Sequence, residues 1–222
     1  MLVLVTSDFH GYEKAFKATA EIAEEEKSDL LIICGDITNF GTIKQAEKYL
    51  SQLVALKKPV LFVPGNCDLP SLLTGEINGA VNLHQKCVLM NDYSFIGIGG
   101  APISPLNTPL EFPEEQMLKW LEMTAEKCSS NKLILVSHSP PYDTKLDLAF
   151  IGEHVGSYSV RRFIEERKPI AVFCGHVHEA RGIDKIGSSI LVNPGPARHG
   201  FYAIVNLDED VKVVLKNFKG KG

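Results

Sequence analysis

The chain has no long apolar run, no basic stripe and no pair of cysteines separated by two residues. A helix that spans a bilayer needs about 18 or more consecutive apolar residues, so we expect no membrane segment. The apolar N-terminus lacks a basic region and a cleavage-like site, which is typical of a first strand rather than a signal peptide. With a net charge of −4, the chain gives no strong signal for nucleic-acid binding.

Cysteine is also scarce, because the 222 residues contain 5, an odd number. Cys34 and Cys174 end apolar runs, where cysteine behaves as a small hydrophobic residue. Without metal-site spacing or an even framework, reduced thiols in a cytoplasmic protein are the simplest interpretation. The sequence leaves the oligomeric state open, and a homo-oligomer is possible.

Apolar residues are abundant: they make up 45% of the chain, against 23% charged residues. This balance indicates a globular protein, and we expect one domain over residues 1–222. In the first third, continuous apolar runs alternate with segments of helical periodicity, which predicts parallel strands buried on both faces. The expected strands are 2–7, 29–34 and 60–63, and the expected helices are 12–26 and 42–56.

The remainder of the chain mixes short strands with further helices. Two proline-rich stretches, 101–113 and 139–146, predict irregular loops that either line a substrate site or cross the surface. Asn91-Asp92 is a hairpin turn signal. The expected helices are 114–126 and 158–167, and the expected strands are 87–90, 93–98, 133–137, 170–174, 181–186, 189–193, 202–207 and 211–217. Together these elements predict an α/β fold with two sheets.

Metal-binding residue types follow five of the apolar runs. In open α/β sheets, sites gather outside the carboxyl ends of the strands, so neighbouring strands would bring these side chains together. Their oxygen and imidazole donors suit borderline divalent ions such as Mn, Fe, Co, Ni or Zn. The candidate ligands are Asp8, His10, Asp36, Asn66, His138, His176 and His178.

Asp36 is the candidate that could serve two ions, because one carboxylate can bridge them through its two oxygens. Two ions about 3.5–4 Å apart can clamp both the attacking and the leaving oxygen of an in-line displacement. Two divalent ions contribute about +4, while Asp8 and Asp36 contribute −2. The sequence therefore favours an anionic phosphoryl group as the substrate over a neutral molecule.

The ordered motifs resemble those of the calcineurin-like metallophosphoesterase superfamily, which are D-x-H, G-D, G-N-H-[DE], a lone H and G-H-x-H. In this chain they are Asp8-Phe9-His10, Gly35-Asp36, Gly65-Asn66-Cys67-Asp68, His138 and Gly175-His176-Val177-His178. The resemblance covers nearly the whole chain and is greatest to compact bacterial and archaeal phosphodiesterases. It implies a two-sheet α/β/β/α sandwich and a phosphate-ester substrate.

The resemblance also implies two metal subsites bridged by Asp36, with Mn as the first expectation for the metal. A hydroxide shared by the two ions would attack phosphorus, with Asp36, Asn66 and His176 in the catalytic centre. The implied ligands are Asp8, His10 and His178 at one ion, and Asn66, His138 and His176 at the other.

Cys67 departs from the pattern, because the superfamily often has a histidine there. A thiol is a weak hydrogen-bond donor, so we expect phosphodiesters, or esters whose leaving groups are stable as anions, to be hydrolysed in preference to monoesters with poor leaving groups. Compact members often carry cysteine at this position, and the Cys67 thiol is either catalytic or structural. His154 precedes a predicted helix N-terminus suited to anions, and it could take the place of the missing histidine.

A second class of function stays open, since fold alone does not establish catalysis. One retromer subunit has this fold and serves as a non-catalytic scaffold. A scaffold has no need of a complete ligand set, and all seven candidates are present here. A DNA-repair nuclease of the same superfamily would normally bring a longer chain.

Overall fold

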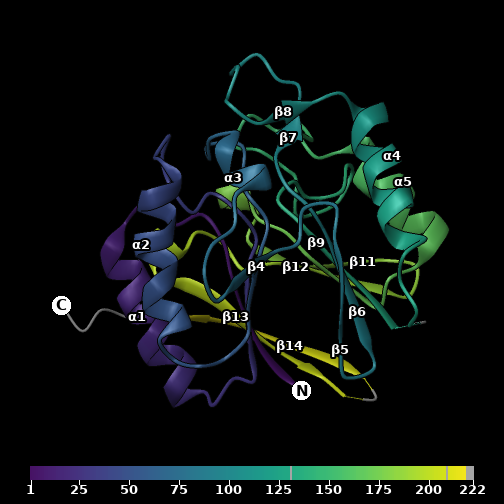
Figure 1. Cartoon of the computed structure of the whole chain (residues 1–222). Helices are drawn as coiled ribbons and strands as arrows, with labels where there is room; N and C mark the ends of the chain where they lie inside the picture. The colour runs from purple at the N-terminus through teal and green to yellow at the C-terminus, as the bar shows by residue number, and fades with distance from the viewer. Residues whose placement is uncertain (131, 209, 219–222) are drawn as a thin grey trace.

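Two β-sheets packed face to face form the centre of the computed structural model, which describes residues 1–130, 132–208 and 210–218 (Figure 1). The first sheet contains, in spatial order, β14 (Val211–Asn217), β13 (Phe201–Leu207), β1 (Leu2–Thr6), β2 (Leu30–Ile33), β3 (Val60–Phe62) and β4 (Ala80–Asn82). The second contains β11 (Gly182–Ile186), β12 (Ser189–Asn193), β10 (Ala171–Phe173), β9 (Lys132–Ser137), β6 (Tyr93–Ile98) and β5 (Cys87–Met90). A short parallel pair is formed by β7 (Ala101–Pro102) and β8 (Glu111–Phe112).

Helices cover the outer face of each sheet (Figure 1). The first sheet carries α1 (Glu13–Glu25) and α2 (Ile43–Val54), and the second carries α4 (Glu114–Ala125) and α5 (Tyr158–Arg167). A single short turn forms α3 (Ser71–Thr74). α2 begins at a capping box, in which Thr42 and Gln45 each accept the other's backbone N–H. This reciprocal pair satisfies two donors that the first helical turn leaves free.

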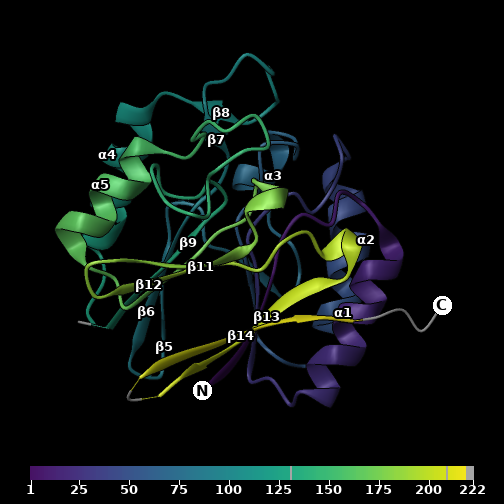
Figure 2. The same ribbon diagram turned by 180° about the vertical axis from the view of Figure 1, so that it is seen from behind.

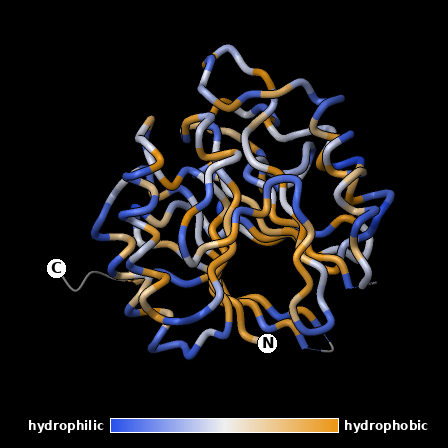
Figure 3. The backbone as a smooth tube through the Cα atoms, viewed as in Figure 1, coloured by the Kyte–Doolittle hydropathy of each residue, from blue (hydrophilic) through white to orange (hydrophobic). Residues whose placement is uncertain are grey.

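Three apolar layers hold the sheets and helices together, as the hydrophobic colouring of the central strands shows (Figure 3). Side chains alternate between the layers along each strand, since successive residues of a strand point to opposite faces. In β1, Val3 and Val5 pack between the sheets, whereas Leu4 packs against α1 and α2. In β10, Phe173 lies between the sheets and Val172 faces α4 and α5.

The carboxyl ends of the central strands gather at one edge. β1, β2 and β3 pair in parallel, and so do β6, β9, β10 and β12 in the second sheet. β13 returns antiparallel beside β1, so the two ends of the sequence meet in one sheet (Figure 2). Parallel strands that are buried on both faces explain the continuous apolar runs of the sequence.

The α/β/β/α arrangement confirms the expected fold class, and each expected strand and helix is present within a few residues. The pattern missed α3, β4 and the pair β7–β8, all of which have four residues or fewer. Such elements are too short to show a periodicity. In the part of the chain that the structure describes, no helix is long and apolar enough to cross a bilayer. The single domain over 1–222 stays a prediction.

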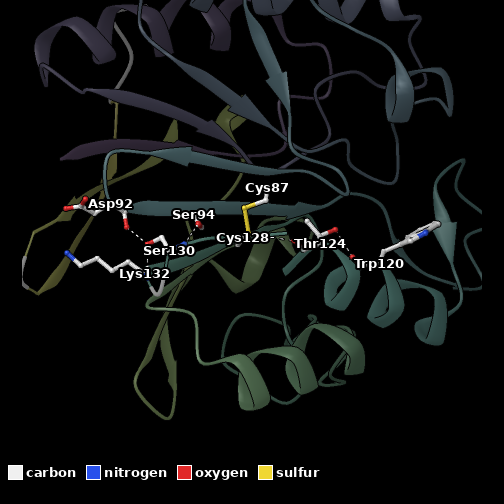
Figure 4. The surroundings of a disulfide bond; sticks show 8 residues. All are labelled: Cys87, Asp92, Ser94, Trp120, Thr124, Cys128, Ser130 and Lys132. Carbon is white, nitrogen blue, oxygen red and sulfur yellow. Dashed lines mark hydrogen bonds between the residues drawn. A yellow bond between two sulfur atoms is a disulfide. The ribbon is translucent and has the colours of Figure 1, made fainter. Parts of the chain in front are cut away.

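The expectation that all thiols are reduced is wrong for one pair, because Cys87 and Cys128 form a disulfide (Figure 4). Cys87 begins the edge strand β5, and Cys128 follows the end of α4, which packs on the same sheet. Their Cα atoms are 5.8 Å apart although 41 residues separate them in sequence. No local pattern reveals such a tertiary contact. Cys34, Cys67 and Cys174 are free, and a cytoplasmic location stays a prediction.

Reduction of this disulfide should lower the free energy of unfolding by about 4 kcal/mol, because the open chain regains the entropy of a 41-residue loop. Urea unfolding with and without reductant measures the difference. In the double variant Cys87→Ser, Cys128→Ser the reductant should have no effect. An equal midpoint for reduced and oxidised wild type would contradict the prediction.

Candidate metal centre

The seven candidate ligands form a closed ring of contacts at the carboxyl edge of the two sheets. Each lies in the loop that follows a strand: β1, β2, β3, β9 or β10. Neighbours around the ring are 2.8–3.6 Å apart. In ring order they are Asp8, His178, His10, Asp36, His138, Asn66 and His176, whose backbone N–H returns to Asp8. The expected meeting of these side chains is confirmed, and their assignment as ligands stays a prediction.

Four of these residues have an unusual backbone conformation. Asp8, His10, Asp36 and His176 have φ of 56°, 47°, 50° and 69°. Positive φ is uncommon outside glycine, although Asp and His tolerate it better than most residues, and each instance costs on the order of 1–3 kcal/mol. This conformation turns the side chains of the four residues toward one another immediately after their strands. Packing of the sandwich has to offset the cost.

Asp8 and the imidazoles of His10 and His178 form one half of the ring. Nε2 of His178 lies 3.3 Å from Asp8 Oδ1 and 3.2 Å from His10 Nε2. Burial alone would raise the pKa of Asp8, but the hydrogen bond from His178 and the neighbouring imidazole charges hold it well below its usual range. Burial also lowers the pKa of His10 to about 4. At neutral pH the set therefore contains a carboxylate and a neutral imidazole, the forms that bind metals.

In the other half of the ring, Asn66 Oδ1 faces two imidazole nitrogens, His138 Nε2 at 2.8 Å and His176 Nδ1 at 2.9 Å. A second chain of contacts fixes this orientation of the amide. Thr108 donates its hydroxyl hydrogen to Glu111 Oε1 (2.6 Å), so its oxygen can only accept from Asn66 Nδ2 (3.0 Å). Glu111 is ionised for this role, because hydrogen bonds from Thr108 and Ser104 outweigh burial and lower its pKa to about 2.

His138 and Asn66 can present two lone pairs to each other, and such a contact fits a cation site. His138 Nδ1 donates to the Cys34 carbonyl oxygen at 2.7 Å, so Nε2 is an acceptor whenever Nδ1 carries the only hydrogen of the ring. It lies 2.8 Å from Asn66 Oδ1, which is also an acceptor. No hydrogen can join these two atoms in that tautomer, whereas a divalent ion can bind both. The donor set therefore fits a metal.

Asp36 lies between the two halves of the ring. His10 Nε2 is 3.5 Å from its Oδ2, and His138 Nε2 is 3.6 Å from its Oδ1. The backbone N–H of Cys67 donates to Oδ1 at 2.8 Å. Burial, together with the nearby charges of Asp8 and Asp68, raises the pKa of Asp36 to about 7 although the charge of His138 opposes the shift. A carboxyl in this state gains from the positive charge of a metal.

Asp68, at the end of the third motif, ties the Asp36 and Asn66 loops together. Its buried carboxylate accepts backbone N–H groups of Ile37, Thr38 and Gly65 at 2.8–3.1 Å. Gly65 is required next to it, since a Cβ there would lie 2.1 Å from Asp36 Oδ1. The glycine therefore permits the close approach of the two loops. The hydrogen bonds to Asp68 stabilise this approach.

Cys67 contacts a residue of the ring, whereas the contacts of His154 are with residues outside it. The Cys67 thiol lies 3.7 Å from Asn66 Nδ2, and burial followed by the charge of Asp36 raises its pKa well above its usual range. It is therefore a neutral thiol at neutral pH. His154 instead bonds to Asp147 at 2.8 Å and lies against Tyr142, neither of which belongs to the ring. Its expected role as a substitute acid stays a prediction.

A cavity of about 160 Å³ adjoins the ring at His10. Polar side chains from the loop after β2 and from α2 dominate its walls. Larger surface grooves, of about 520 and 610 Å³, contain none of the seven candidates. The residues that line the small cavity include His10, Thr38, Asn39, Gln45 and Tyr49.

Residues 1–180 match the family model of the calcineurin-like phosphoesterases. The chain belongs to this family. The match ends just after the His176-Val177-His178 motif, so it includes every candidate ligand. The family of phosphoesterases uses divalent metals, in agreement with the donor chemistry of the ring.

Relatives within this family differ in how much of their length is shared. Uncharacterized protein MJ1162 of Methanocaldococcus jannaschii is 37% identical over 99% of this chain and 98% of its own length. The probable glycerophosphodiester phosphodiesterase GpdQ of Arcobacter nitrofigilis is 28% identical, but the match spans 68% of this chain and 57% of that protein. The crystal structure of TT1561 of Thermus thermophilus superposes with a TM-score of 0.77 at 20% identity, covering 97% of this chain and 98% of that one. At that identity the superposition supports the fold alone.

Nothing in the sequence singled out Thr108, Glu111 or Arg198. The first two lie in the proline-rich stretch 101–113, for which the sequence predicts either a substrate wall or a surface crossing. The structure links this loop to the ring through Asn66. Arg198 donates from Nη2 to His178 Nδ1 at 3.2 Å, and it follows the Asn193-Pro194-Gly195 stretch without a motif of its own. For Thr108 and Glu111, an acidic residue three positions after a threonine is too common a pattern to predict the chain of hydrogen bonds that orients Asn66.

The affinity of the metal-free protein for Mn²⁺ should rise roughly tenfold from about pH 6 to about pH 8. A pKa of about 7 leaves Asp36 mostly protonated at the lower pH and mostly ionised at the higher one, and a cation has to displace the proton. Titration calorimetry in buffers of different ionisation enthalpy measures both affinity and proton release. An affinity that does not change over this range would contradict the prediction.

Proposed function

We propose that this protein is a metal-dependent phosphodiesterase with two divalent ions in the ring of seven ligands. The observation that carries the proposal is the 2.8 Å contact between two ligand atoms, Asn66 Oδ1 and His138 Nε2, within the ring of seven candidates. Asp36, which has contacts to both halves of the ring, would be the shared ligand. When bound, the ions supply an activated water as nucleophile and positive charge for the phosphoryl oxygens.

The chain's own residues act by holding this donor set in place. Asn66 presents its oxygen because Thr108 and Glu111 fix its amide, and His138 presents Nε2 because Cys34 accepts from its other nitrogen. His176 closes the ring through its backbone N–H, which donates to Asp8. Such outer partners orient metal ligands and commonly affect metal affinity by about 10–100-fold.

Cys67 supports a diester, or an ester whose leaving group is stable as an anion, over a monoester with a poor leaving group. A neutral thiol beside Asp36 is a weak donor for a departing alkoxide, so leaving groups that are stable as anions are favoured. The small polar cavity beside His10 suits a small hydroxylated ester group. The name of the Arcobacter relative, a probable glycerophosphodiester phosphodiesterase, supports this class of substrate.

A non-catalytic scaffold is the alternative function. It would gain nothing from strained backbone at Asp8, His10, Asp36 and His176, each of which costs stability. It would equally have no need of the Thr108–Glu111 relay that orients Asn66. These features favour the enzyme. Mn is the first choice of metal, with Fe, Ni, Co and Zn as alternatives.

Purified protein loaded with Mn²⁺ should hydrolyse an aryl phosphodiester faster than the corresponding aryl phosphomonoester. Chelator should abolish both activities, and His176→Ala should lower kcat/KM roughly a hundredfold or more, since the metals contribute several kcal/mol to the reaction. Absorbance of the released phenolate measures the rates. His199→Ala is the matched control: the side chain is exposed, lies outside the ring and should be dispensable.

Two results would contradict the proposal. Full activity of a chelator-stripped sample would remove the metal from the mechanism. Tight binding of Mn²⁺ without turnover of any phosphoester would favour the scaffold.

A further inference from the structure

Arg198 lies beside the ring but outside the residues that match the family, which end at 180. It belongs to a short 3-10 turn, Ala197–His199, that follows β12. The backbone of this turn is tied to the first motif, because Ala197 N–H donates to the Ser7 carbonyl at 2.7 Å and Arg198 N–H to the Asp8 carbonyl at 3.4 Å. These bonds hold the Arg198 side chain against the Asp8–His10–His178 half of the ring.

The guanidinium of Arg198 is incompletely satisfied. Nη2 donates to His178 Nδ1 at 3.2 Å. Nε is buried and, among the described residues, has no hydrogen-bond partner. Arginine carries donors only, and a buried donor without an acceptor is unfavourable. The site therefore lacks an acceptor, and an anion would provide one.

The contact with His178 does not explain why an arginine is present. Nε2 of His178 faces Asp8 and His10, so Nε2 is the atom available to a metal. In a ring that ligates through Nε2, Nδ1 carries the hydrogen and normally donates it to an oxygen acceptor. Arg198 cannot accept that hydrogen. In the metal-loaded site the two donors would face each other, and the guanidinium would have to find another partner.

We propose that Arg198 binds the non-bridging phosphoryl oxygens of the substrate, an inference that rests on the proposed function. Release from His178 would free Nη2, which joins the unpartnered Nε as a second donor on the same planar guanidinium. Guanidinium donors match the spacing of two phosphate oxygens and form short, charge-assisted hydrogen bonds. No other arginine or lysine in the described part of the chain is hydrogen-bonded to a candidate ligand. Arg198 therefore supplies the protein's own positive charge for the substrate anion.

Inorganic phosphate is the probe for the first test, because its binding does not depend on turnover. Calorimetric titration of the Mn²⁺-loaded full chain should give a dissociation constant about tenfold or more higher for Arg198→Met than for wild type. Metal content, measured by plasma mass spectrometry, should be unchanged. Arg162→Met is the matched control: Arg162 is exposed on α5 and pairs with Glu166, so its loss should leave phosphate binding unaltered.

Arg198→Lys separates charge from geometry. Lysine keeps the positive charge but lacks the two parallel donors of the planar guanidinium. The phosphate affinity of Arg198→Lys should therefore lie between those of wild type and Arg198→Met. With an aryl phosphodiester, Arg198→Met should raise KM more than it lowers kcat. Thermal melting curves show whether each variant is folded.

The inference is overturned if folded Arg198→Met binds phosphate as wild type does, or if it loses metal, since the residue would then only support His178. Failure of the proposed function has a different signature. A wild type that binds phosphate through Arg198 but hydrolyses no ester would retain the anion site without the enzyme. A wild type that hydrolyses diesters while Arg198→Met leaves phosphate binding and KM unchanged would retain the enzyme without the anion site.

Discussion

Two lone pairs that face each other across the edge of the sandwich are the constraint on which the site depends. His138 can donate to the Cys34 carbonyl only through Nδ1, and Asn66 can donate to Thr108 only through Nδ2. When Nδ1 carries the only hydrogen of the His138 ring, both residues therefore present an acceptor to the same point. A cation resolves this conflict, and it would also stabilise the ionised form of Asp36, whose pKa is raised by burial and by the charges of Asp8 and Asp68. The electrostatics of the ring thus favour a metal before any mechanism is considered.

The packed sandwich offsets the conformational free energy that this arrangement of the ring costs. Four of the ring residues have left-handed backbone, and Gly65 and Asp68 bring two loops into close contact. Three apolar layers and parallel strands hold the ends of those loops rigidly. Stability of the core therefore offsets strain at the edge, as is common where function demands an exact geometry. Arg198 adds the positive charge that a phosphoryl substrate needs at this edge.

Most of the fold and the composition of the ring could be predicted from the sequence. Continuous apolar runs indicated the parallel strands. A polar residue directly after such a run, such as Asp36, lies at the carboxyl end of its strand, where the functional site was expected. Contacts that depend on the path of loops were not predictable. Thr108 reaches Asn66 across 42 residues and Arg198 reaches His178 from a separate turn, without any periodic signal. The Cys87–Cys128 disulfide was missed for the same reason.

We propose that Asp36 is the one ligand that both ions share. Metal stoichiometry of purified variants, measured by plasma mass spectrometry after equilibration with Mn²⁺, tests it most directly. Wild type should hold about two ions per chain, Asp8→Asn about one, and Asp36→Asn clearly less than one, because loss of a bridging carboxylate weakens both subsites. Two ions in folded Asp36→Asn, or the loss of only one with the other held as tightly as in wild type, would contradict the account.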